Sequence, residues 1–280
     1  ASAAIEEKIV SLNEKFDVSK GFIKVPGGII RDAHRHGVLT FKEVIQKSSN
    51  VGASQIALRL GKERFYNYIK KFGFGEKTGI DLPGEAKGLV RKTEKWSGRS
   101  LPSIAIGQEI SVTPLQLLRA YSAIANGGKL MKPYIVSGII SHEGEIIKSF
   151  SPEVEKQVVS ETTAKTMRDI LKTVVEEGGT AQKASVTGDM VAGKTGTAQM
   201  VDPKTGLYSK NDYASSFVGF TPADNPKIAL IVVVFKPRGA SYGGTVAAPV
   251  FKNIAEQAFV YLNEPMENEE NSVLLVSNHR

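Results

Sequence analysis

The strongest constraint on the fold comes from an uninterrupted apolar run, 228–235, near the end of the chain. A strand with one solvated face would alternate apolar and polar residues. This run does not, so we expect a strand that is covered on both faces. Two further strand-like runs precede it, at 190–201 and 214–221, and only short turns separate the three. This spacing predicts an antiparallel meander, because strands joined by short turns run in opposite directions.

Helical patterns occupy much of the remaining chain. Thr40 followed by Glu43, and Thr113 followed by Pro114, are typical of helix N-termini. Helices are predicted to begin after both caps and to cover 51–60, 63–72, 161–177 and 249–262. Short strands are predicted within 17–31, a hairpin around 142–144, and an irregular excursion at 73–100. The sequence therefore predicts an α+β protein: an antiparallel β-sheet with helices on both faces, plus a mostly helical subdomain.

Composition narrows the classes of function. The 280 residues include no cysteine, which excludes disulfides, thiolate zinc sites and a cysteine nucleophile. The formal charge is +7, but the Lys and Arg residues are spread along the chain and form no dense basic block. We therefore predict no nucleic-acid partner, while an anionic cell wall or membrane surface stays possible. The longest apolar run, 228–235, is far shorter than the roughly 20 residues of a membrane-spanning helix.

A tetrapeptide inside the first predicted strand has chemical potential. Lys194, Thr195, Gly196 and Thr197 place one cation and two hydroxyl groups beside a glycine. A glycine within a strand often marks a point where a ligand or another backbone approaches closely. A cation with hydroxyl donors suits a carboxylate. Taken alone, however, a solvent-facing sheet edge is the simpler interpretation.

A second short motif, Ser48-Ser49-Asn50, lies between two predicted helices. Taken alone, an ordinary capped turn is the simpler interpretation, because Ser and Asn favour such positions. His34 and His36 could suggest a metal site, but residues at i and i+2 share a face only in a strand. No acidic partner is evident for them, so we predict no metal and no cofactor. For Trp96 and Tyr242, packing is at least as good an interpretation as a place in a binding groove.

Together, the two motifs gain specificity. Ser-x-Asn followed far downstream by Lys-Thr-Gly resembles the second and third elements of the serine penicillin-recognising enzymes. Further segments in the same order resemble class B penicillin-binding proteins: 72–75, 78–83, 106–108, 112–117, 124–128, 216–223 and 242–251. The segment 104–118 resembles the division and sporulation members more than the elongation members. The resemblance covers roughly residues 1–262 and implies a β-lactamase/transpeptidase-like fold. We expect 1–262 to be a transpeptidase domain and 263–280 a flexible tail.

The first element of that family, Ser-x-x-Lys, is missing from the sequence. No lysine has a serine three residues before it, and the nearest imitations, at 162–165 and 180–183, come after Ser48 instead of preceding it. The helical start at 1–4 resembles the segment directly after Ser-x-x-Lys in the family. We therefore expect that the nucleophile and its base lie just before Ala1 and that residues 1–280 alone are inactive.

The resemblance also implies roles for the residues that are present. Ser48 would relay a proton towards the leaving amine, Asn50 would hold the amide of the donor peptide, and Lys194 would supply positive potential. Thr195 and Thr197 would bind the terminal carboxylate beside Gly196. The Thr197 N–H would complete an oxyanion hole.

The implied substrates are peptidoglycan stem peptides ending in D-Ala-D-Ala, with β-lactams as inhibitors. The implied partners are a membrane glycosyltransferase and division proteins, at the extracytoplasmic face of the bacterial membrane. Three alternatives stay open: a serine β-lactamase, a β-lactam sensor, and a non-catalytic fragment that needs its missing N-terminal piece. The first lacks a convincing deacylating base in this sequence, and the matching segments do not favour the second.

Overall fold

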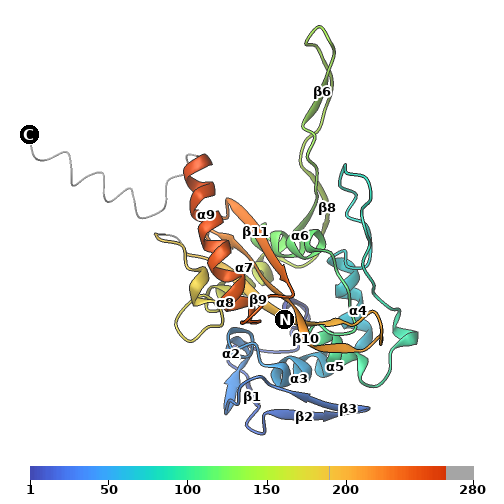
Figure 1. Ribbon diagram of the computed structural model, residues 1–280, viewed down its shortest axis with the longest axis vertical. Coiled ribbons are helices and arrows are strands. Elements are labelled where there is room, and N and C mark those ends of the chain that lie inside the picture. Colours follow the sequence, from blue (N-terminus) through green and yellow to red (C-terminus); the bar gives the residue numbers. More distant parts are fainter. Residues whose placement is uncertain (189, 263–280) are drawn as a thin grey trace, which may run out of the picture.

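A three-stranded antiparallel sheet lies at the centre of the protein in this computed structural model, which describes residues 1–188 and 190–262 (Figure 1). β9 (Ala192–Val201) pairs with β10 (Tyr208–Thr221), and β10 pairs with β11 (Ile228–Phe235). The order across the sheet is therefore β11-β10-β9. The predicted antiparallel meander is confirmed.

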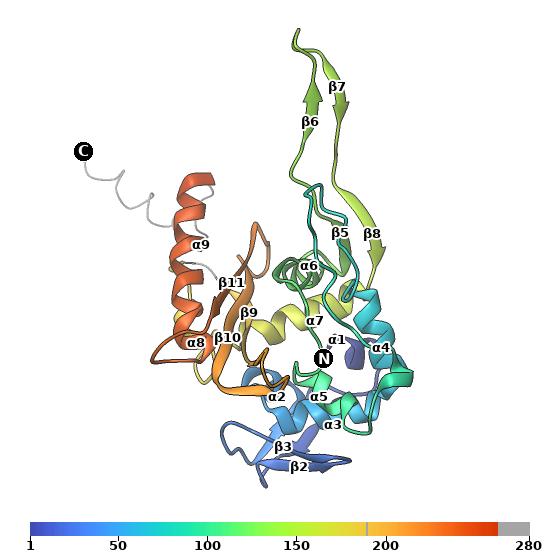
Figure 2. The same ribbon diagram turned by 45° about the vertical axis from the view of Figure 1, so that its right-hand side comes forward.

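Helices cover both faces of this sheet, as Figure 2 shows. On one face lie α8 (Gly243–Val246) and α9 (Ala248–Leu262), and on the other lie α6 (Pro114–Ala125) and α7 (Glu161–Lys172). Under α9 the fully buried rings of Phe217 and Phe251 meet edge to face, with centroids 4.8 Å apart. Burying each ring contributes about 1.5–3 kcal/mol. The predicted covering of the sheet is confirmed.

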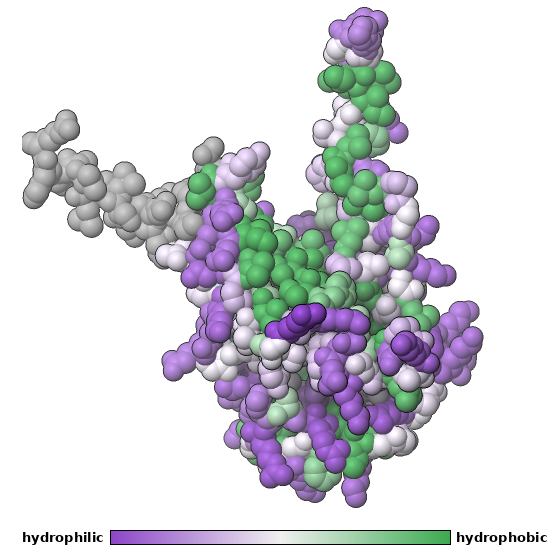
Figure 3. Space-filling view, viewed as in Figure 1, coloured by the Kyte–Doolittle hydropathy of each residue, from purple (hydrophilic) through white to green (hydrophobic). Residues whose placement is uncertain are grey.

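β11 occupies the edge of the sheet. Both α6 and α9 contact it, so helices cover its two faces as expected. Its residues are nevertheless only half-buried, and Phe235 is exposed. Within the described part of the chain, no strand pairs with its outer edge. Figure 3 shows the apolar surface that results beside α9. An entirely apolar strand at a sheet edge is unusual, because such edges are normally protected by charge, proline or a cover.

The predicted helical subdomain packs beside the sheet. It contains α1 (Ser2–Glu6), α2 (Phe41–Gln46), α3 (Asn50–Leu60), α4 (Lys62–Lys71), η1 (Thr93–Lys95) and α5 (Ser100–Ala105). Two small antiparallel ribbons adjoin these helices: β1 (Lys15–Asp17) with β4 (Val38–Thr40), and β2 (Phe22–Val25) with β3 (Gly28–Arg31). One continuous core joins the subdomain to the sheet, since buried side chains of α2, α3, α7 and β10 belong to the same cluster.

A long hairpin projects from the body of the protein (Figures 1 and 2). Its base is β5 (Lys129–Lys132) paired with β8 (Glu153–Gln157), and its outer part is β6 (Gly138–Ile140) paired with β7 (Ile146–Ser149). All residues of β6 and β7 are exposed. The predicted hairpin around 142–144 is confirmed.

Local signals at the helix ends behave as expected. Thr40 with Glu43, and Thr113 with Gln116, form capping boxes in which both reciprocal hydrogen bonds are present. Two expectations were wrong in detail: α7 ends at Lys172, well before 177, and α5 was not predicted. Among the described helices, none combines the length and the apolarity that crossing a membrane requires. The predicted tail at 263–280 lies outside the described residues.

Candidate active site

Ser48 sits in a strained turn after α2. Its φ is 57°, in the left-handed region that residues other than glycine seldom adopt. The turn is held from both sides: the Ser48 N–H donates to the Ile45 carbonyl (3.2 Å) and the Ser49 N–H to the Val44 carbonyl (3.0 Å). Such a conformation costs about 1–3 kcal/mol and is found preferentially at functional sites. Ser48 is exposed, so its hydroxyl is accessible.

Ser49 and Asp32 fix the start of α3 behind this turn. The buried Ser49 is the N-cap, and its Oγ accepts a hydrogen bond from the Gly52 N–H (3.0 Å). The same hydroxyl donates to Asp32 Oδ2 (2.8 Å), while the Val51 N–H donates to Asp32 Oδ1 (2.9 Å). The carboxylate lies at a helix N-terminus, where the helix dipole favours negative charge. Asp32 was missed from the sequence; its position directly after a predicted strand was the only available signal.

Asn50 lies in the first turn of α3 and is partly exposed. Its Nδ2 donates to the Arg31 carbonyl (2.8 Å), which ties the side chain to the end of β3. Within the described part of the chain, the Asn50 Oδ1 atom has no hydrogen-bond partner. It is therefore available as an acceptor for an amide N–H.

Lys194 reaches Ser48 from the edge strand β9. Its Nζ donates to Ser48 Oγ over 2.9 Å, although the two residues are 146 positions apart in the chain. The ammonium also contacts the carbonyl (3.3 Å) and the hydroxyl (3.2 Å) of Thr195. Loss of hydration lowers the pKa of Lys194 from 10.5 to about 8. The two motifs predicted from the sequence thus meet in one place.

The hydroxyl groups of the tetrapeptide are held by neighbouring segments. Thr195 Oγ1 shares a hydrogen bond with Thr180 Oγ1 (2.9 Å), and Thr197 Oγ1 accepts one from the Gly243 N–H (3.1 Å). Thr180 was also missed as a site residue, since the sequence marks it only as the start of the imitation of Ser-x-x-Lys at 180–183. A Cβ at Gly196 would lie 2.5 Å from Ser216 Oγ, so a side chain there would require the Ser216 hydroxyl to rotate away. The glycine thus allows the Ser216 hydroxyl of β10 to lie close to β9.

Two rings lie close together next to the tetrapeptide. Tyr242, the N-cap of α8, stacks with His34 from the loop after β3, with ring centroids 6.3 Å apart. Both side chains are exposed. Trp96 packs elsewhere, edge-on against Phe65 and Tyr66. The packing interpretation is therefore confirmed for Trp96, whereas Tyr242 lies beside the candidate site.

The arrangement presents one cation and several hydroxyl groups along the free edge of β9. Such a set can bind a carboxylate and pass a proton between hydroxyl groups, but it offers a metal few ligands. In the described ranges, no cluster of three or more His, Asp or Glu side chains could hold a metal ion. The backbone of β9 is unpaired on its outer side among the same residues, so an extended peptide can add there as a further strand.

Comparisons with known sequences agree with this geometry. The profile of the family described as "Penicillin binding protein transpeptidase domain" matches residues 1–256. Stage V sporulation protein D of Bacillus subtilis is 44% identical over 273 residues, which make up 96% of this chain and 42% of that protein. The probable peptidoglycan D,D-transpeptidase PenA of Neisseria gonorrhoeae is 32% identical over 90% of this chain and 41% of its own length. The chain thus spans less than half the length of these relatives.

Solved structures agree as well. The crystal structure of penicillin-binding protein 3 from Mycobacterium tuberculosis, complexed with aztreonam, superimposes with a TM-score of 0.87 at 38% identity. The match covers 95% of this chain and 61% of that one. At this identity the similarity extends beyond the fold to the order of the sequence segments.

Proposed function

Because the chain belongs to the penicillin-binding protein transpeptidase domain family, among its class B members, we propose that it forms the substrate-binding side of a peptidoglycan D,D-transpeptidase site. The observation that carries the proposal is the 2.9 Å hydrogen bond from Lys194 Nζ to Ser48 Oγ. It brings the Ser-x-Asn and Lys-Thr-Gly motifs together, as a proton relay beside a carboxylate site requires.

The donor stem peptide would lie along the free edge of β9. Its terminal carboxylate would accept hydrogen bonds from the hydroxyl groups of Thr195 and Thr197, close to the positive charge of Lys194. Gly196 would leave room for the peptide at this point, since it carries no side chain. Asn50 Oδ1 would accept the N–H of an internal amide of the donor.

Acylation would require a serine from outside residues 1–280, in a Ser-x-x-Lys element. Its Oγ would attack the carbonyl carbon between the two terminal D-alanines, and its proton would pass to the neighbouring lysine. The Thr197 N–H would stabilise the oxyanion that forms. The C–N bond then breaks, and the departing amine takes its proton through the Ser48 hydroxyl, which Lys194 orients. An amine of a second stem peptide would displace the serine from the acyl group.

Three other functions are compatible with the same fold. A serine β-lactamase would also need a base that activates water for deacylation. A β-lactam sensor would keep the acyl group and signal its presence. A non-catalytic fragment would form no covalent adduct with a stem peptide or with a β-lactam. The hydrogen bond between Lys194 and Ser48 gives no reason to prefer any of these three over a transpeptidase. The similarity to PenA, which is named as a probable peptidoglycan D,D-transpeptidase, supports the transpeptidase.

Labelling with a fluorescent penicillin tests the proposal. We expect no covalent label on residues 1–280 alone, and stable labelling once the Ser-x-x-Lys segment is supplied. Matched samples with Lys194→Ala should label far more slowly. Covalent labelling of residues 1–280 alone would contradict the external nucleophile, whereas rapid hydrolysis of the penicillin by the completed domain would indicate a β-lactamase.

The wider assignments belong to the same proposal. Residues 1–262 would act as the transpeptidase domain, on stem peptides that end in D-Ala-D-Ala and with β-lactams as inhibitors. The domain would work at the extracytoplasmic face of the bacterial membrane, with a membrane glycosyltransferase and division or sporulation proteins as partners.

A further inference from the structure

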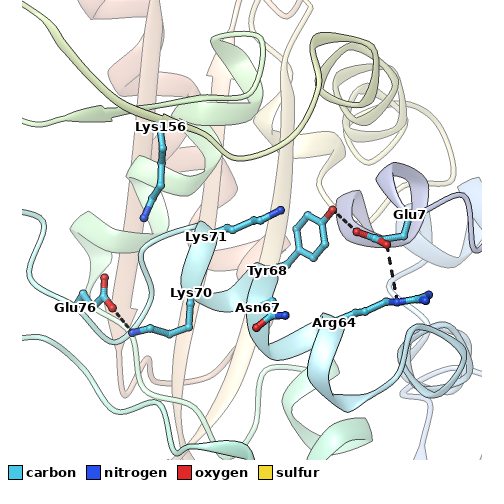
Figure 4. A pocket seen from close by; sticks show the side chains of 8 residues that line it. All are labelled: Glu7, Arg64, Asn67, Tyr68, Lys70, Lys71, Glu76 and Lys156. Carbon is cyan, nitrogen blue, oxygen red and sulfur yellow. Dashed lines mark hydrogen bonds and ion pairs between the residues drawn. The ribbon is translucent and has the colours of Figure 1, made fainter.

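A cavity of about 430 Å³ lies between α1, α4 and β8, and it contains none of the residues of the candidate active site. Figure 4 shows the eight side chains that line it: Glu7, Arg64, Asn67, Tyr68, Lys70, Lys71, Glu76 and Lys156. Four are cations and two are carboxylates, so the lining carries an excess of positive charge.

The carboxylates are committed at the two ends of the cavity. At one end Glu76 pairs with Lys70, with 2.5 Å between the charged atoms. At the other end Glu7 accepts a hydrogen bond from the Tyr68 hydroxyl (2.8 Å) and lies 3.9 Å from Arg64 Nε. Figure 4 shows these pairs on opposite sides of the view. Both ends are therefore close to neutral.

The positive charge that remains lies between those ends. The Lys71 ammonium sits 4.6 Å from the centre of the Tyr68 ring and forms no ion pair among the described residues. Lys156 lies 3.2 Å from Glu155, but that carboxylate also pairs with the buried Arg119. The carboxylate of Glu6 feels the charge of Lys71, yet it is occupied by Ser160. No carboxylate is therefore fully available to either lysine.

We propose that this cavity binds a phosphate ester between Lys71 and Lys156, with the Asn67 amide as an additional donor. The free donors decide the chemical class. A phosphate group carries several acceptor oxygens and up to about two negative charges on one centre, so it matches two ammonium groups that lack a full counter-charge better than a single carboxylate does. The guanidinium here, Arg64, is already directed to Glu7. The site does not depend on the transpeptidase proposal, because it shares no residue with it.

The test titrates two phosphate probes into the detergent-solubilised full-length protein and monitors binding by phosphorus NMR. One probe is glycerol 3-phosphate, and the other is the short-chain lipid dihexanoyl-phosphatidylglycerol. The variant is Lys71→Gln with Lys156→Gln. The control, Lys165→Gln with Lys183→Gln, removes the same charge from exposed positions that lie outside the cavity. Melting temperatures establish that each protein is folded, and the single variants replace the double one if it is not.

We expect the cavity variant to weaken binding about fivefold to thirtyfold and the control to change it less than twofold, because two ammonium contacts are lost. Tighter binding of the lipid probe would identify a lipid headgroup as the source of the phosphate ester. Equal or better binding of glycerol 3-phosphate would identify a soluble or polymeric ester instead. Equal binding by all three proteins, or no binding of either probe, would overturn the proposal. Glutarate binding as tightly as phosphate would overturn the assignment to phosphate esters.

Discussion

Lys194 and Ser48 are joined by a hydrogen bond of 2.9 Å, with Lys194 on the edge strand β9 and Ser48 at the end of α2. The contact connects the sheet to the helical subdomain. It also combines two unfavourable local states, a partly dehydrated ammonium and a left-handed backbone at a residue other than glycine. Costs of this kind are typical of functional sites, where less stable local conformations hold reactive side chains in place.

Replacing Ser48 should separate stability from activity. In Ser48→Gly the left-handed backbone becomes easy, so the free energy of unfolding should stay within about 1 kcal/mol of the parent or rise. Loss of the hydroxyl should slow acylation by about 10²-fold to 10⁴-fold in the domain completed with its Ser-x-x-Lys segment. Penicillin labelling rates and urea unfolding measure the two quantities. Ser48→Ala is the control, with the same loss of rate and no relief of strain; an active glycine variant would argue against the proton relay.

The stability of the protein should depend on pH through Lys194. Its pKa is about 8 in the folded protein and 10.5 when unperturbed. Between these values the unfolded chain binds more protons than the folded one, so the free energy of unfolding rises with pH. Below pH 8 the cost of burying the ammonium is fully present. Lys194→Met avoids this cost, so it should be more stable than the parent at pH 8 and below. The difference in the free energy of unfolding should shrink by up to about 3 kcal/mol between pH 8 and pH 10.5. Urea unfolding at pH 7, 8.5 and 10 checks this, and an unchanging difference would contradict the lowered pKa.

Asp32 should contribute more to the stability of the folded protein than an exposed aspartate does. Asp32→Ala removes the acceptor for the Ser49 hydroxyl and the Val51 N–H, so we expect a loss of about 1–3 kcal/mol in the free energy of unfolding. Asp212→Ala is the control, since Asp212 pairs with Lys236, whose side chain is exposed; its loss should stay below about 1 kcal/mol. Thermal unfolding compares them. Similar losses would show that Asp32 does not brace the start of α3.

Gly196 and Ser216 should show a steric coupling. In Gly196→Ala the new methyl group would lie 2.5 Å from Ser216 Oγ, so the Ser216 hydroxyl must rotate to another rotamer and we expect a destabilisation of about 0.5–1.5 kcal/mol. Ser216→Ala removes the clashing oxygen and should restore most of this loss in the double variant, while having little effect alone. A double-mutant cycle of urea unfolding energies measures the coupling. Additive effects would show that β9 and β10 adjust without strain.

Local signals explain which elements could be predicted from the sequence. The caps at Thr40 and Thr113 act within one helical turn, so their residues alone specify the helix starts. The three strands of the meander are consecutive in the chain, which makes their pairing local. Asp32 and Thr180 escaped prediction because their roles depend on partners brought close only by folding.

Elements without a strong period were harder to predict. α5 is six residues long and contains Pro102, so it lacks the apolar period of a helix. After α7 the chain turns away at Thr173, whose hydroxyl donates to the Ile170 carbonyl over 2.7 Å. No glycine or proline marks that point in the sequence. The apolar run of β11 indicated a covered strand correctly, but an edge position cannot be inferred from one strand alone.

The projecting hairpin has a practical consequence for protein engineering. Its outer strands, β6 and β7, are fully exposed, while the base strands β5 and β8 remain paired with each other below them. A protease that nicks the tip at 142–144 would leave two pieces held together by that pairing and by the packing of α6 on α7. The tip is therefore a place where the chain can be opened, tagged or circularly permuted at a distance from the elements that carry Ser48 and Lys194.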